Sequence, residues 1–184
     1  MPNLIVFATE MERDGVFQNG IPQGYDCIIS GMGILSTALS LSNVFQKKSY
    51  GSAIQMGIAG AYRSSGIALG DVVEVESDCM VEFLPWEPNT FFATGILPLK
   101  EKLKRVKGAT VLSCAKTEEM GNIRGSFAQI ETMEGAAFFA VCKEYGIQAA
   151  QVRAISNYAA LCEKSEWEIE KALNKLREAT RSIF

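Results

Sequence analysis

The segment from Ile130 to Ala159 constrains the fold most narrowly, because it combines a predicted helix, a turn and a strand in direct succession. The helix is expected to open at Glu131-Thr132-Met133-Glu134, and its apolar positions recur at helical spacing at Ala137, Phe138, Val141 and Tyr145. Gly146 is predicted to end it, and residues 149–155 to form a strand. Ser156 and Asn157 then follow the strand's carboxyl end, where open α/β sheets bind ligands. We therefore expect Glu134 and Asn157 to face one pocket.

Further short apolar runs predict additional strands. Such runs are typical of strands that are buried on both faces of a parallel sheet. They cover residues 4–8, 25–30, 53–56 and 109–114, while Gly70-Asp71 is expected to form a turn that feeds another strand. Helices are predicted over 34–45, 97–106 and 165–183, the last with a capping box of Ser165 and Glu168. We therefore expect one α/β domain over residues 1–184.

The absence of histidine restricts the chemistry that this chain can perform. The 184 residues contain five scattered cysteines and no histidine, which excludes Ser-His-Asp and Cys-His catalysis and the usual zinc sites. We predict no metal and no cofactor. The net charge of −3 and the lack of a long apolar run predict a cytoplasmic protein that binds neither nucleic acid nor membrane. Carboxylates remain available, and they are sufficient for cleaving a glycosidic bond.

Two other segments lie where predicted strands end. The acidic stretch from Thr9 to Gly15 follows the first strand and is expected to form a loop that reaches the pocket. The glycine-rich segment 57–61, Gly-Ile-Ala-Gly-Ala, follows the start of the third strand, and its glycines would let the main chain approach a planar ligand.

Four motifs together resemble the nucleoside phosphorylase and nucleosidase superfamily. They are GIAGA at 57–61, GDVV at 70–73, MEGAA at 133–137 and RAISN at 153–157. Asn157 and the later Trp167-Glu168-Ile169 are similar to the futalosine hydrolase family within it. The resemblance runs from about Leu4 to Leu176. It implies an α/β three-layer sandwich with a mixed, largely parallel central sheet flanked by helices.

The resemblance also implies roles for individual residues. Glu12 matches the general base, although Glu10 remains an alternative, and Glu134 matches the residue that holds the ribose hydroxyls, with Met133 against the sugar. Asn157 would support the departing base. The expected substrate-binding residues are Ile58, Ala59, Gly60, Met133, Glu134 and Ser156. Arg153 is expected to form a structural ion pair.

Differences from relatives indicate the substrate and the nucleophile. Relatives that cleave adenine nucleosides carry Asp where this chain has Asn157, and an Asn amide can donate to the O6 atom of a 6-oxopurine. Phosphate-dependent relatives carry Arg and Ser where this chain has Gln55 and Ile58, which favours water as the nucleophile. Arg63 lies nearby in the sequence, so phosphate is not fully excluded at this point.

The expected reaction is hydrolysis of futalosine to hypoxanthine and dehypoxanthine futalosine, a step of menaquinone biosynthesis. The alternatives are a methylthioadenosine or S-adenosylhomocysteine nucleosidase, a purine nucleoside phosphorylase, and a non-catalytic nucleoside-binding homologue. The resemblance implies a homodimer whose small-molecule partner is a purine nucleoside. The aromatic segment 80–95 would cap the pocket, lie in the dimer interface or simply pack as a loop.

Overall fold

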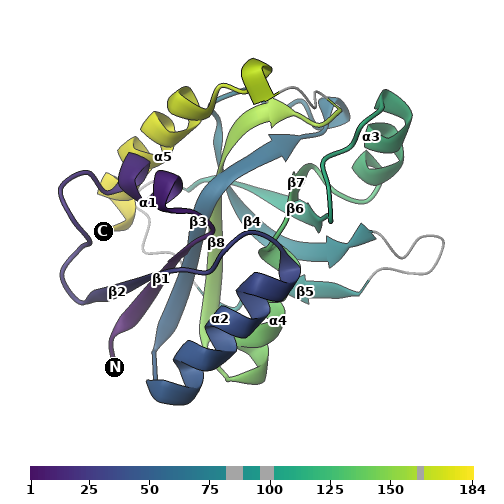
Figure 1. The fold of residues 1–184 in the computed structure, drawn as a ribbon. Helices are drawn as coiled ribbons and strands as arrows, with labels where there is room; N and C mark the ends of the chain where they lie inside the picture. The colour runs from purple at the N-terminus through teal and green to yellow at the C-terminus, as the bar shows by residue number, and fades with distance from the viewer. Residues whose placement is uncertain (82–88, 96–101, 161–163) are drawn as a thin grey trace.

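The structure, a computed structural model, describes residues 1–81, 89–95, 102–160 and 164–184. The described strands form one mixed sheet, and helices cover both of its faces (Figure 1). The strands are β1 (Asn3–Phe7), β2 (Tyr25–Ile29), β3 (Ser52–Ala61), β4 (Val72–Met80), β5 (Thr90–Phe92), β6 (Lys104–Thr110), β7 (Ile130–Thr132) and β8 (Gln148–Tyr158). The helices are α1 (Glu10–Val16), α2 (Ile34–Lys47), α3 (Glu118–Gly125), α4 (Gly135–Glu144) and α5 (Ile169–Ile183), and short 3₁₀ turns span Arg63–Ser65 and Lys164–Glu166.

Strand β3 is the centre of the sheet. It pairs in parallel with β1 and with β8, and β1 pairs in parallel with β2. Strand β8 also pairs antiparallel to β4, which pairs in parallel with β6 and antiparallel to β5. Strand β6 pairs in parallel with β7, and β7 returns to the end of β3 in antiparallel pairing. The pairings of β3, β8, β4, β6 and β7 therefore close a ring, whereas the sequence alone indicated only an open sheet.

The apolar runs are explained by burial on both faces of this sheet. In β1, Leu4 and Val6 belong to the core that includes residues of α2 and α4, while Ile5 and Phe7 belong to the core that includes residues of α1 and α5. Figure 1 shows these two helix pairs on opposite sides of the strands. Side chains of a strand alternate between faces, so two covered faces require an uninterrupted apolar run. The predicted fold class, a mixed α/β sheet flanked by helices, is confirmed.

The predicted helix over 97–106 is wrong where the structure describes it. Residues 96–101 lie outside the described residues, and Lys104–Thr110 forms β6 between β4 and β7. The predicted strand 109–114 accordingly extends only to Thr110. The charged side chains of Lys104 and Arg105 are exposed in β6, as they would be on the wet face of a helix. Pairing with two neighbouring strands decides the conformation where the charge pattern fits both structures.

Two helix starts also differ from the prediction. Residues 130–132 form β7, and α4 begins only at Gly135. The capping box of Ser165 and Glu168 does not form, because α5 begins at Ile169 and the main-chain N–H of Glu168 donates to the carbonyl oxygen of Ser156 at 2.8 Å. Conversely, Gly146 ends α4 as predicted: it has a φ of +65°, and Ile147 donates back to the carbonyl oxygen of Cys142.

The expected acidic loop after β1 is helix α1. Thr9 is its N-cap and forms a reciprocal capping box with Glu12. At the other predicted turn, Asp71 accepts a hydrogen bond from the main-chain N–H of Ala68, as expected of a turn residue. Within the described ranges, no helix has both the length and the apolar character that crossing a membrane requires.

Candidate active site

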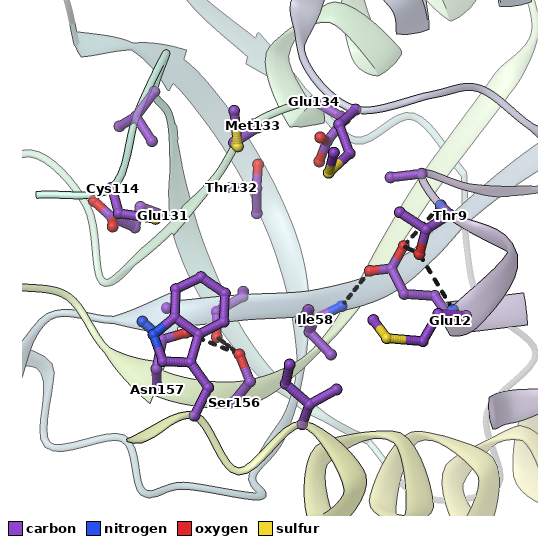
Figure 2. Close-up of a pocket in the computed structure, with 18 residues that line it drawn as sticks. Thr9, Glu12, Ile58, Cys114, Glu131, Thr132, Met133, Glu134, Ser156 and Asn157 are labelled. Atoms are coloured by element: carbon purple, nitrogen blue, oxygen red, sulfur yellow. Dashed lines mark hydrogen bonds between the residues drawn. The ribbon is translucent and has the colours of Figure 1, made fainter. Parts of the chain in front are cut away.

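A cavity of about 380 Å³ opens at the carboxyl ends of β1, β3, β6, β7 and β8. The residues proposed from the sequence all line it: Glu12, Ile58, Ala59, Gly60, Met133, Glu134, Ser156 and Asn157. Figure 2 shows Glu12 and Glu134 toward one end of this pocket, and Asn157 and Ser156 toward the other. The structure therefore brings together segments that are far apart in the sequence, and it places the acid of MEGAA and the amide of RAISN on one cavity.

The carboxylate of Glu12 is held on both of its oxygens. Oε2 accepts from the main-chain N–H of Thr9 at 3.1 Å and from its hydroxyl at 3.0 Å, while Oε1 accepts from the main-chain N–H of Ile58 at 3.0 Å (Figure 2). Burial raises the pKa of Glu12, and the positive charge of Arg153 opposes that rise. A fixed carboxyl group with a raised pKa suits a general base.

Glu10, the sequence alternative to Glu12, lies elsewhere. Its side chain is 76% exposed and forms an ion pair with Arg13 at 3.9 Å, and it does not line the cavity. The difference follows from helix geometry, because residues two positions apart on a helix do not share a face. Of the two acids, only Glu12 can reach a molecule bound in this pocket.

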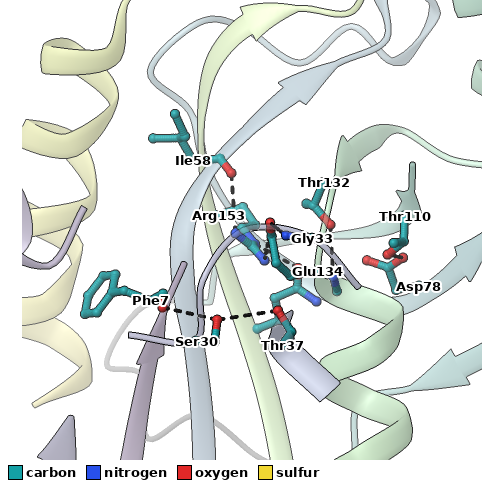
Figure 3. Close-up of polar contacts among 12 residues, drawn as sticks. Phe7, Ser30, Gly33, Thr37, Ile58, Asp78, Thr110, Thr132, Glu134 and Arg153 are labelled. Atoms are coloured by element: carbon teal, nitrogen blue, oxygen red, sulfur yellow. Dashed lines mark hydrogen bonds and ion pairs between the residues drawn. The ribbon is translucent and has the colours of Figure 1, made fainter. Parts of the chain in front are cut away.

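Glu134 is held by a main-chain donor and a buried cation. Its Oε1 accepts from the N–H of Gly33 at 2.9 Å, and its Oε2 lies 3.8 Å from Nη2 of Arg153 (Figure 3). Arg153 therefore forms the ion pair that the sequence predicted. The segment Gly31-Met32-Gly33 thus donates a main-chain hydrogen bond to the carboxylate of Glu134.

Gly57 has a different role from the one expected of the glycine-rich segment. A Cβ atom at residue 57 would lie 2.5 Å from Oε1 of Glu12 and 2.8 Å from Nη1 of Arg153. Glycine is needed here so that the acid and the cation can approach the strand, and Gly57 does not line the cavity. Ile58, Ala59 and Gly60 do line it, as predicted.

Asn157 is oriented by its neighbours at the end of β8. The hydroxyl of Ser156 donates to Oδ1 of Asn157 at 2.8 Å, and Nδ2 of Asn157 donates to the carbonyl oxygen of Tyr158 at 3.3 Å. The amide oxygen is thereby engaged as an acceptor, and one of the two amide hydrogens is used. Among the contacts of the described residues, the second amide N–H remains available to a ligand.

Several lining residues were not identified as site residues from the sequence. They are Ala8, Thr9, Met11, Met32, Val111, Cys114, Glu131, Thr132, Trp167 and Ile169. Trp167 was expected in the packing stripe of the last helix, but it precedes α5 and lines the cavity. The hydrogen bond from Glu168 to Ser156 ties this segment to β8, a contact that no sequence pattern indicates.

Of the residues related to phosphate binding, Ile58 lines the cavity, whereas Gln55 and Arg63 do not. Gln55 is fully buried in β3, and Arg63 lies 4.7 Å from the ring of Tyr158 and lines a separate, smaller pocket. Among the described residues that line the main cavity, three are acidic and none is Lys or Arg. The described residues also contain no group of His, Cys, Asp and Glu side chains placed to bind a metal ion.

Known proteins resemble this chain in both sequence and fold. Residues 108–184 match the family model of the phosphorylase superfamily. Futalosine hydrolase from Thermus thermophilus is 28% identical over 187 residues, which cover 88% of this chain and 81% of that protein.

Solved structures share the fold at low sequence identity. A futalosine hydrolase mutant of Helicobacter pylori matches with a TM-score of 0.85 and 16% identity over 100% of this chain and 98% of its own. The 5'-methylthioadenosine/S-adenosylhomocysteine nucleosidase of the same species matches with a TM-score of 0.85 and 17% identity over 100% and 97%. These matches make the chain similar to the nucleoside phosphorylase and nucleosidase superfamily. Within that superfamily its sequence is futalosine hydrolase-like.

Proposed function

We propose that this protein is a nucleosidase that hydrolyses the N-glycosidic bond of futalosine, releasing hypoxanthine and dehypoxanthine futalosine. The observation that carries the proposal is the placement of two fixed carboxylates, Glu12 and Glu134, on the same cavity as the oriented amide of Asn157. The futalosine hydrolase relative supports the choice of substrate. With that substrate, the reaction would serve menaquinone biosynthesis in the cytoplasm.

The reaction requires three kinds of assistance, and the pocket offers a residue for each. Glu12 deprotonates and orients the attacking water, since its pKa is raised and its geometry is fixed by Thr9 and Ile58. Glu134 binds the ribose hydroxyls and stabilises the positive charge that develops on the sugar, with Met133 beside it. Asn157 donates a hydrogen bond to the departing base, which leaves as an anion and is protonated from solvent, while Glu12 returns its proton to solvent. Ser156 orients that amide, and the main chain of Ile58, Ala59 and Gly60 contacts the base and the ribose.

Water is the proposed nucleophile rather than phosphate. A phosphate dianion requires cations and fixed donors, whereas the described lining residues include three carboxylates and no Lys or Arg. Arg63, the nearby cation that the sequence left open, lines a different pocket. Turnover is therefore expected to be independent of added phosphate.

The base is proposed to be a 6-oxopurine. Ser156 engages the amide oxygen of Asn157, which leaves an N–H group for the ligand. An N–H donor complements the O6 atom of hypoxanthine and opposes the 6-amino group of adenine. A methylthioadenosine or S-adenosylhomocysteine nucleosidase is the competing function, and it shares this fold.

Product chromatography tests the proposal directly. The purified protein is incubated with futalosine, inosine and methylthioadenosine, each with and without phosphate. We expect hypoxanthine from futalosine at equal rates in both buffers. Adenine release from methylthioadenosine as the fastest reaction would establish the competing nucleosidase, and phosphate-dependent turnover would establish a phosphorylase. Binding of purines without turnover of any of the three would indicate a non-catalytic homologue.

A homodimer is proposed on the outer face of α2. Leu35 and Leu39 are 72% and 58% exposed on this helix, and Met32, just before it, is 63% exposed and lines the cavity. An apolar strip next to a binding site is typical of a protein interface. Light scattering is expected to give a dimer mass for the wild type and a monomer for Leu35→Lys. Leu112→Lys, at a similarly exposed leucine outside α2, is the control.

A further inference from the structure

Next to the pocket is a buried acid that the proposed chemistry does not use. Asp78 of β4 is 0% exposed and does not line the cavity. Its Oδ1 accepts from the hydroxyl of Thr110 at 2.7 Å, and that hydroxyl accepts from the main-chain N–H of Ala136 at 2.7 Å (Figure 3). Ala136 lies in the first turn of α4, two residues after Glu134. Asp78 is thus connected through Thr110 to the first turn of α4, which follows Glu134 directly.

A second set of contacts leads from Asp78 to the side chain of Glu134. A Cβ atom at residue 135 would overlap Oδ2 of Asp78 and lie 2.8 Å from Nε2 of Gln151, so both side chains press against Gly135. Oε1 of Gln151 accepts from Nε of Arg153 at 2.8 Å. Arg153 in turn forms the ion pair with Glu134.

We propose that Asp78 is a positioning residue for Glu134, acting on its main chain through Thr110 and Ala136 and on its side chain through Gln151 and Arg153. This inference rests on the proposed function, because it concerns the grip of Glu134 on the ribose. Gly135 belongs to the same arrangement, since only a residue without a Cβ lets Asp78 approach the start of α4 so closely.

The electrostatic cost of this arrangement indicates that it is not merely structural. Burial raises the pKa of Asp78 to about 7, with Glu134 adding to the rise, while Thr110, Arg153 and Gln151 oppose it. The charged groups that act on Asp78 are therefore Arg153 of β8 and Glu134 at the start of α4. Buried polar groups with incomplete partners stabilise a fold less than packed apolar groups of the same volume. A buried acid at this position is therefore better explained by the need to position Glu134 at the start of α4 than by stability.

The experiment compares variants of the two ends of the first path. Asp78→Ala removes the carboxylate that accepts the hydrogen bond. Thr110→Val removes the hydroxyl, whereas Thr110→Ser keeps a hydroxyl at the same position. Thr180→Val is the control, because Thr180 is also largely buried and its hydroxyl donates to the carbonyl oxygen of Arg177 in α5, away from Glu134. Two quantities are measured for each variant: kcat/KM for futalosine, and Kd for free hypoxanthine, which requires only the base end of the pocket.

We expect kcat/KM to fall about 10- to 100-fold in Asp78→Ala and in Thr110→Val, as for a small displacement of a catalytic group. The double variant should lose no more than Asp78→Ala alone, because the path through Thr110 begins at Asp78. Thr110→Ser and Thr180→Val should stay within about threefold of the wild type, and Kd for hypoxanthine should be unchanged throughout. Equal losses in Thr110→Ser and Thr110→Val, or parallel losses of base binding, would overturn the proposal.

Two further outcomes are separable. If Asp78→Ala does not fold, the comparison of Thr110→Val with Thr110→Ser decides alone. If the wild type cleaves no purine nucleoside, the proposed function fails, and the ratio of Kd for inosine to Kd for hypoxanthine then reports the grip on the ribose. That ratio should rise in Thr110→Val and stay constant in Thr110→Ser, and an unchanged ratio in both would refute the role of Asp78.

Discussion

The two ends of the pocket are built from different kinds of polar group. At one end, Glu12 and Glu134 share the buried cation Arg153, and each also accepts from a main-chain N–H. At the other end, Asn157 is oriented by neutral partners, the hydroxyl of Ser156 and a main-chain carbonyl. Charges held in fixed positions stabilise a charged transition state, whereas neutral donors and acceptors discriminate between bases. With the proposed function, the charged end would carry out the reaction and the neutral end would recognise the base, so we expect that each end can be altered independently.

The largest effect is expected from Glu12→Gln at the charged end. Loss of the general base should lower kcat/KM for futalosine by about 10²- to 10⁴-fold. Steady-state hypoxanthine release measures the loss, and Glu10→Gln, at the exposed neighbouring acid, should remain within about twofold. An equal effect of both substitutions would remove the distinction between these two glutamates.

Glu134→Ala should reduce kcat/KM by about a hundredfold, because charge-assisted hydrogen bonds to the ribose are lost. Circular dichroism should show the fold intact, since Glu134 makes no side-chain cap bond to α4. Hypoxanthine should still bind with wild-type Kd in calorimetry. Near-normal kcat/KM would refute the ribose role, and loss of base binding would show that the two ends are coupled.

Asn157→Asp, at the recognition end, should change selectivity more than rate. An acid at this position accepts from a 6-amino group and lacks the N–H that O6 requires, so the ratio of kcat/KM for futalosine to that for methylthioadenosine should fall about 10- to 100-fold. Competition between the two substrates in one vessel measures this ratio. A constant ratio would remove the basis for assigning a 6-oxopurine.

The smallest effect concerns stability and the buried acid Asp78. Its pKa of about 7 in the folded protein exceeds the ordinary value of about 3.9, so folding favours the protonated form. The stabilising contribution is therefore fully present below about pH 4 and is lost as the pH rises through 7. Between pH 5 and 8, the Tm of the wild type should fall relative to Asp78→Asn by about 5–10 °C, which corresponds to a loss of about 2.6 kcal/mol. A constant difference in Tm over that range would mean that Asp78 does not titrate there.

Some segments adopt the structure that their sequence predicts and others do not, for physical reasons that can be named. Strands β1, β3 and β8 were predicted because burial on both faces requires apolar runs that are visible in the sequence. The prediction of a helix around Lys104 and Arg105 was wrong, because the exposed residues of a strand and the solvent-facing side of a helix have similar charged composition. Trp167 was expected in the packing stripe of the last helix, but it precedes that helix and lines the cavity. The hydrogen bond of Glu168 to Ser156, which holds this segment in place, depends on contacts between distant segments and is not visible in the sequence.

The amino-acid sequence was sufficient to predict the class of fold, the inventory of reactive groups without histidine, and the segments that supply Glu12, Glu134 and Asn157. Three features became visible only in the folded chain: Glu12 rather than Glu10 faces the cavity, Gly57 makes room for an acid and its cation, and Asp78 lies against the start of α4. The reason is physical. Apolar periodicity and residue chemistry are local properties of the chain, whereas burial, distance and the sharing of one cation arise only when remote strands pair.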